Sequence, residues 1–159
     1  MDIVGLGQAG CNLADCFSKY PQYKIYKIDV GVEGDRCFNV QKQNTPEDYE
    51  ANTPNFTDFF SGLGQEVTFI VGGAGYISAM SLATLQQIKD KKISILYICP
   101  KQKSLTGKKK LLERATFGIL QQYARSGLVE DIHLVSNENV ANIIGNLPVI
   151  GYYDKINDL

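Results

Sequence analysis

The chain has 159 residues, about the length of one ordinary domain, with 44% hydrophobic and 21% charged residues. This composition is typical of a globular protein and argues against a wholly disordered chain. The formal net charge of −1 argues against a dedicated nucleic-acid binder, because phosphate backbones demand a surplus of Lys and Arg. The one basic run, Lys108–Lys110, is interpreted as a solvated helix start, with phosphate contact as the alternative.

The inventory of metal-binding and redox-active side chains is small. His133 is the only histidine and no two of the four cysteines form a C-x-x-C pair, so a zinc site is not expected. Cys11 and Cys99 are interpreted as small buried side chains, and reduced thiols in a cytosolic setting are the simplest account. We find no signal-peptide pattern and no apolar run near ~20 residues, so we expect a cytoplasmic protein that does not enter a membrane.

The first half of the chain combines clear apolar patterns with one long polar stretch. Residues 31–62 are polar and rich in Asn, Pro and Asp, and loops are expected over most of them. The predicted elements, in chain order, are a strand over 3–6, a turn over 7–10, a helix that ends by Pro21, a strand over 23–28 closing on Asp29, a short strand over 37–40 and a helix near 56–60.

The second half is easier to interpret. Residues 67–71 form a continuous apolar run of the kind that is buried on both faces of a parallel sheet. The predicted elements are that strand, a helix over 78–89, a strand over 93–98, a helix over 108–125 terminated by Gly127, a strand over 132–135, a short helix over 140–144 and the start of another helix over 149–159.

Strands that alternate with helices through short loops predict the α/β class: a doubly wound, mostly parallel sheet with helices on both faces. Ligands of such sheets bind outside the carboxyl ends of the strands. The loops expected to bind a ligand are therefore those after Leu6, Ile28, Val71, Ile98 and Val135.

The first of these loops is glycine-rich. Residues 5–10 match the G-x-G-x-x-G pattern, in which backbone N–H groups and a helix N-terminus approach a phosphate. Asp29 ends the second strand, near the offset where an acidic residue would bind a ribose hydroxyl. Taken alone, these features favour an NAD(P)-binding Rossmann domain. The alternative is a turn whose glycines only let a helix pack on a strand.

A second glycine-rich turn, Gly72-Gly73-Ala74-Gly75-Tyr76-Ile77-Ser78, follows the buried strand over 67–71. Two such turns suggest a triphosphate held from both sides, and here the chain resembles the tubulin/FtsZ family. The second turn is similar to that family's G-G-G-T-G-T/S-G signature. Ala74, Tyr76 and Ile77 depart from it at the first threonine, the second threonine and the last glycine.

Further similarities follow in the order of the family. Residues 101–109 are similar to the FtsZ stretch K-P-F-x-F-E-G-K-R/K, which borders the ribose and phosphates; Thr106 stands at its glutamate and Lys109 at or beside its arginine. Phe117-Gly118-Ile119 is similar to a G-I pair on the next helix. Residues 132–139 resemble the I-x-I-P-N-D-x-L strand and loop, which implies that Asn137 contacts guanine and ribose.

The end of the chain carries the last similarity. In FtsZ the central helix begins with a phenylalanine that stacks on guanine and, four residues later, an asparagine that binds it. Tyr153 and Asn157 have this spacing, which places both side chains on one helix face. An amide offers the donor and the acceptor that the guanine edge requires.

The resemblance implies a GTP/GDP site with Mg²⁺. Its contact residues are expected to be Gly7, Gln8, Ala9, Gly10, Cys11, Asn12, Gly72, Gly73, Ala74, Gly75, Tyr76, Thr106, Lys109, Asn137, Tyr153 and Asn157. The family's N-T-D-x-Q-A-L motif and G-A-G loop have no clear counterpart over 31–66, so the acidic group near metal and γ-phosphate is Asp29 or Asp48.

The resemblance also bears on domain organisation and activity. Residues 1–159 are expected to be one nucleotide-binding domain that ends inside the central helix, without the second, activation domain of the family. In the family the water-activating acid follows that helix and acts on the neighbouring subunit's nucleotide. We therefore expect a fragment, of phage or plasmid type, that binds GTP with little hydrolysis and whose full-length form joins copies of itself head to tail in a filament.

Three functions remain open from the sequence. They are a GTP-binding domain of a filament-forming cytoskeletal protein, an NAD(P)-binding oxidoreductase domain, and a degenerate family member that serves as an interaction or structural module. The altered signature at Tyr76 and Ile77 supports the third.

Overall fold

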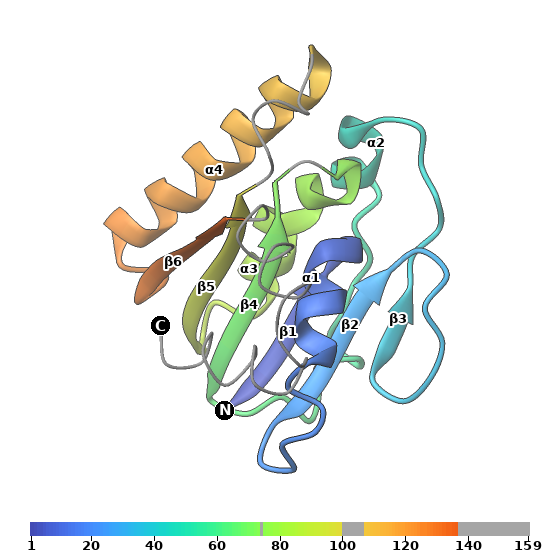
Figure 1. Cartoon of the computed structure of the whole chain (residues 1–159), viewed down its shortest axis with the longest axis vertical. Coiled ribbons are helices and arrows are strands. Elements are labelled where there is room, and N and C mark those ends of the chain that lie inside the picture. Colours follow the sequence, from blue (N-terminus) through green and yellow to red (C-terminus); the bar gives the residue numbers. More distant parts are fainter. Residues whose placement is uncertain (74, 100–106, 137–159) are drawn as a thin grey trace, which may run out of the picture.

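The computed structural model describes residues 1–73, 75–99 and 107–136. The helices expected over 140–144 and 149–159 lie outside these ranges. Within them, six strands form one sheet in which every pair of neighbours is parallel (Figure 1). The strands are β1 (Asp2–Leu6), β2 (Lys24–Asp29), β3 (Cys37–Asn39), β4 (Glu66–Gly72), β5 (Lys92–Cys99) and β6 (Asp131–Ser136). The predicted α/β class and parallel sheet are confirmed.

The strand order is β3-β2-β1-β4-β5-β6. The chain therefore builds outward from β1 in one direction to β3, crosses back over the sheet, and builds outward from β4 in the other direction. Leu6 at the end of β1 pairs with Ile28 of β2 on one side and with Val71 of β4 on the other. The order reverses between β1 and β4, and this is the place where doubly wound sheets form a crevice for ligands.

The helices lie on both faces of the sheet because alternate side chains of each strand point to opposite faces. Ile3 of β1, Ile70 of β4 and Ile98 of β5 form a core with α1 (Gly7–Asp15). The neighbouring strand residues, such as Val4 and Tyr97, pack on the other face with residues of α2, α3 and α4. These last helices are α2 (Pro46–Ala51), α3 (Ser81–Gln87) and α4 (Lys108–Ser126).

Helix α1 begins earlier than predicted. The sequence suggested a turn over 7–10, whereas the helix begins at Gly7, whose positive φ of 76° makes the whole turn from strand to helix. Two other glycines set the distance between α1 and the sheet. A Cβ on Gly10 would lie 2.4 Å from the carbonyl oxygen of Ile70, and a Cβ on Gly5 would lie 2.7 Å from that of Gly10. Side chains at either position would push α1 off β1 and β4.

The region between β3 and β4 contains an unexpected helix and lacks the expected one. Thr45 caps α2: its hydroxyl accepts a 3.1 Å hydrogen bond from the N–H of Asp48, and Pro46 occupies the first turn. Residues 57–62 form turns rather than the predicted helix. Phe56 and Phe60 are nonetheless buried there, and their rings pack on Phe38 and Tyr26. The connection from β3 to β4 is therefore a packed part of the core.

The remaining helices follow the sequence with small differences. The helix expected over 78–89 is a 3₁₀ helix, η1 (Tyr76–Met80), continued by α3. Helix α4 matches its prediction, and Gly127 ends it with a positive φ of 82° and a hydrogen bond from its N–H to the carbonyl of Ala124. Among the described helices, α4 included, none has the length and apolar character needed to cross a membrane.

The contact between α1 and β4 can be tested by adding one methyl group. Gly10→Ala is expected to lower the free energy of unfolding by ~1–3 kcal/mol, because its Cβ would meet the backbone of Ile70. Gly118→Ala, inside α4 with no atom within 4 Å of the new Cβ, is the matched control and should raise stability by ~0.5–1 kcal/mol. Urea unfolding of the two variants checks this, and equal stabilities would contradict it.

Candidate site at the carboxyl ends of β1 and β4

The two glycine-rich turns found in the sequence lie side by side. Because Leu6 pairs with Val71, the residues that leave β1 and β4 begin their turns next to each other at the same edge of the sheet. The turns also touch. A Cβ on Gly72 would lie 3.1 Å from the Cβ of Ala9, and a Cβ on Gly7 would lie 2.8 Å from Cγ2 of Ile77. The structure thus brings together the first predicted group, residues 7–10, and Gly72 of the second.

The N-terminus of α1 carries free hydrogen-bonding capacity toward this edge. Leu6 occupies the N-cap position and makes no side-chain hydrogen bond, and no acidic residue lies in the first turn. The first N–H groups of a helix have no partner within it, and the helix dipole gives them a partial positive charge. Gln8 and Ala9 are exposed, as is Asn12 one turn later. These are the properties of an anion-binding helix terminus.

Cys11 faces the interior instead. It is 5% exposed, and its Sγ lies 3.5 Å from the carbonyl oxygens of both Gly5 and Ile28. Burial, with a further contribution from nearby Asp29, raises the pKa of the thiol to about 12. The side chain is therefore a neutral bridge between α1, β1 and β2, as its interpretation as a small buried residue predicted. A contact from Cys11 to a ligand at this edge would have to come from its backbone.

The second turn is supported from behind by a pair that sequence reasoning did not identify. Tyr97 of β5 is fully buried, and its hydroxyl donates a 3.1 Å hydrogen bond to Oε1 of Glu113 on α4. Burial and the Glu113 carboxylate raise the pKa of Tyr97. A Cβ on Gly73 would lie 1.8 Å from this hydroxyl, so the phenol occupies the space that a side chain would take. No periodic pattern links these residues, since they come from three elements.

Gly75 and Tyr76 form the open part of the second turn. Gly75 is exposed and has an ordinary φ of −80°, and no atom of the residues that the structure describes lies closer than 4.0 Å to the position of a Cβ. Its carbonyl accepts a 2.6 Å hydrogen bond from the hydroxyl of Ser78, which holds the turn against η1. Tyr76 begins η1 and is half-buried. Of the glycines in this turn, Gly75 is the one whose missing side chain is not explained by packing.

Positive charge lies at the same edge of the sheet, at the start of α4. The first turn of this helix consists of Lys108, Lys109 and Lys110. That turn contains no acidic residue, and the N-cap residue makes no side-chain hydrogen bond. Cations at a helix N-terminus oppose the dipole, and a bound anion would remove the conflict. Lys109, predicted to contact the ligand, is exposed. Lys110 is also exposed, and the exposure of these two lysines agrees with a solvated helix start.

Asp29 lies beside the first turn, because it follows Ile28, the partner of Leu6, at the end of β2. Its Oδ1 accepts a 2.8 Å hydrogen bond from the N–H of Val30, and burial raises its pKa. Asp48, the other acidic candidate, is exposed on α2. Across the described ranges, no three His, Cys, Asp or Glu side chains gather as a metal site. Asp29 is thus a single carboxylate, which fits a Mg²⁺ ion held mainly by phosphates and water.

Five of the predicted contact residues lie outside the described ranges. They are Ala74, Thr106, Asn137, Tyr153 and Asn157. The base-binding half of the expected site therefore remains a prediction from the sequence.

The buried thiol predicts a pH dependence of stability. Above pH 9.0, its ordinary pKa, Cys11 loses its proton in the unfolded chain but keeps it in the fold until about pH 12. Its contribution is complete below pH 9.0 and is lost as the pH rises toward 12. Urea unfolding at pH 8, 9, 10 and 11 should show a steeper fall for the natural chain than for Cys11→Ala. Parallel profiles would contradict the assignment.

Comparison with models of protein families and with curated proteins finds no match for this chain. Its function therefore has to be inferred from the sheet edge itself.

Proposed function

We propose that the crevice between the carboxyl ends of β1 and β4 binds a guanine nucleotide, GTP or GDP. The observation that carries the proposal is the contact of two glycine turns at the point where the strand order reverses. One glycine turn with a helix N-terminus suits a single phosphate group or a pyrophosphate. A second turn on the neighbouring strand offers a further set of backbone groups, which suits a longer polyphosphate.

The roles of the described residues follow from their positions. The N–H groups of Gln8, Ala9 and Gly10 would bind phosphate oxygens, and Gly75 would let the second turn approach from the other side. Lys109 would add a positive charge from α4. Asp29 would hold Mg²⁺ through its free carboxylate oxygen or through water, and the ion would supply charge neutralisation for the phosphates.

The choice of guanine rests on the resemblance to the tubulin/FtsZ family. There Asn137, Tyr153 and Asn157 would recognise the base by one stacking contact and two amides. The same resemblance is the basis for proposing that the protein joins copies of itself head to tail, and that hydrolysis, a phosphoryl transfer to water, needs an acidic group from a neighbouring subunit.

The position of Asp29 supports a second candidate function, the binding of a dinucleotide such as NAD(P). A carboxylate at the carboxyl end of β2, next to a G-x-G-x-x-G turn in a sheet of order β3-β2-β1-β4-β5-β6, is the arrangement that binds the ribose of NAD. A third candidate, an interaction module without a ligand, is supported by Gly5, Gly10 and Gly73, whose missing side chains are explained by packing alone.

Nucleotide selectivity separates these candidates. Isothermal titration with GTP, ATP and NADH in the presence of Mg²⁺ should show binding of GTP at least about tenfold tighter than the others, a difference of ~1.4 kcal/mol. A preference for NADH would support the dinucleotide alternative. Absence of heat with all three would support the interaction module.

Gly75→Ala makes this test specific for the second turn. Its Cβ would enter open space at an ordinary φ, so the variant should fold with unchanged stability while its affinity for GTP falls about tenfold or more. Gly118→Ala, where the Cβ is equally unhindered but lies on α4, is the control and should bind GTP as the natural chain does. Unchanged affinity in Gly75→Ala would remove the second turn from the site.

Lys109→Gln is expected to raise the free energy of unfolding and to lower the affinity for GTP. Without nucleotide, the loss of a cation from the first turn of α4 should raise the free energy of unfolding by ~0.3–1 kcal/mol. The affinity for GTP should fall, and the binding of GTP should depend less on salt. Lys92→Gln, exposed at the first residue of β5 and so at the opposite edge, serves as control. A more stable variant with unchanged affinity would make Lys109 a solvated residue only.

A further inference from the structure

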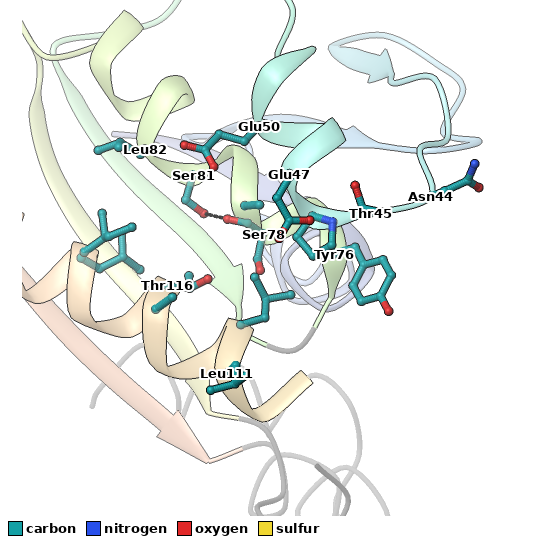
Figure 2. Close-up of a pocket in the computed structure, with 16 residues that line it drawn as sticks. Asn44, Thr45, Glu47, Glu50, Tyr76, Ser78, Ser81, Leu82, Leu111 and Thr116 are labelled. Atoms are coloured by element: carbon teal, nitrogen blue, oxygen red, sulfur yellow. Dashed lines mark hydrogen bonds between the residues drawn. The ribbon is translucent and has the colours of Figure 1, made fainter. Parts of the chain in front are cut away.

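A second hollow lies beside the far end of the second glycine-rich turn, at Tyr76 and Ser78, and we propose that it binds a small amphipathic cation: a molecule with an apolar body and an ammonium group. The cavity, about 420 Å³ in volume, opens between α2, the η1–α3 segment and α4 (Figure 2). This volume is in the range of sites for small organic ligands. The inference does not depend on the proposed nucleotide.

The inner wall of the cavity is apolar. Leu120 and the half-buried Leu112 of α4 form it together with the half-buried Leu82 of α3, and the exposed Ala115 lies nearer the rim. Leu120 is fully buried, whereas Leu111 and Ile119 at the rim are 68% and 37% exposed. The body of a bound molecule could cover these exposed apolar side chains of α4, which is favourable by the hydrophobic effect.

One buried hydroxyl points into this apolar space. Thr116 is only 5% exposed, lines the cavity, and makes no hydrogen bond to any described residue. Figure 2 shows its oxygen directed from α4 toward η1. Ser78 and Ser81, by contrast, donate to the carbonyls of Gly75 and Ser78. The hydroxyl oxygen can be reached from the cavity, since it is not one of the sealed polar atoms of the described residues, and a ligand that donates a hydrogen bond could bind it.

The charge at the mouth of the cavity selects the ligand's sign. Glu47 and Glu50 of α2 both line it, three residues apart and hence on one helix face. Figure 2 shows both carboxylates on the side of α2 that faces the cavity. Within the described part of the chain, none of the lining residues is a lysine, arginine or histidine. An ammonium group would therefore meet two carboxylates and a hydroxyl, while a phosphate or carboxylate would be repelled. The cavity therefore favours a ligand of the opposite charge to a nucleotide, although Tyr76 lies at both places.

A matched series of probes tests the sign of the charge. The series is 4-phenylbutylamine, 4-phenylbutanol and 4-phenylbutanoate at pH 7, titrated by nuclear magnetic resonance of the methyl groups of Leu82, Leu112 and Leu120. The amine should shift these resonances with about tenfold higher affinity than the alcohol, the ratio expected of ion pairs with the two exposed carboxylates Glu47 and Glu50, and the acid should bind most weakly. Equal affinities for the three probes, or no shifts with any of them, would overturn the proposal.

Two sets of variants place the ligand. Glu47→Gln with Glu50→Gln should reduce the affinity for the amine to that for the alcohol. Glu66→Gln with Glu130→Gln removes the same charge from exposed residues at the other edge of the sheet, and should leave the affinity for the amine unchanged. Thr116→Val should lower the affinity for the amine more than the affinity for the acid. If the two double variants lower the affinity for the amine to the same extent, long-range charge explains the selectivity and the proposal fails.

Discussion

The contact between Gly10 and the carbonyl of Ile70 fixes how closely α1 lies on the sheet. A missing side chain at Gly10 lets the helix axis approach β4, and a second missing side chain, at Gly5, lets it approach β1. Ile3, Leu13, Ala14 and Ile70 can then form a core between helix and sheet. The helix that results begins at the carboxyl edge of the sheet, next to the turn after β4. Close packing and the position of the candidate site therefore have one cause.

Much of the fold could be predicted from the sequence because most of its strands are apolar or alternating runs, two of which, β1 and β4, lead into glycine-rich turns. The six strands were placed within a few residues of their observed bounds, and their parallel arrangement followed from the alternation with helices. The prediction was wrong where tertiary packing decides. Phe56 and Phe60 stand at helical spacing, yet residues 57–62 form turns, and the two rings pack on Phe38 and Tyr26. Helix α2 was missed although Thr45-Pro46-Glu47-Asp48 carries the signals of a helix start.

The candidate site was predictable in part for the same reason. Two glycine turns after two apolar strands can be found by reading, and adjacency of β1 and β4 follows from the strand order of doubly wound sheets. The sequence could not predict which structural role each individual glycine has. Gly10 and Gly73 face protein, Gly7 makes a turn, and Gly75 faces open space, which only the neighbouring Ile70, Tyr97 and Ile77 reveal. A glycine motif thus indicates positions where a side chain would not fit. The atoms that would clash with that side chain can be identified only from the tertiary structure.

The phenol of Tyr97 joins two parts of the molecule that have no sequence relation. On one side it fills the space behind Gly73, and on the other it holds the Glu113 carboxylate on the first half of α4. Since all three groups are buried, none can shift alone without leaving a void or a polar group without its partner. A change at this one phenol would consequently disturb both the backbone at Gly73 and the packing of α4, the longest described helix.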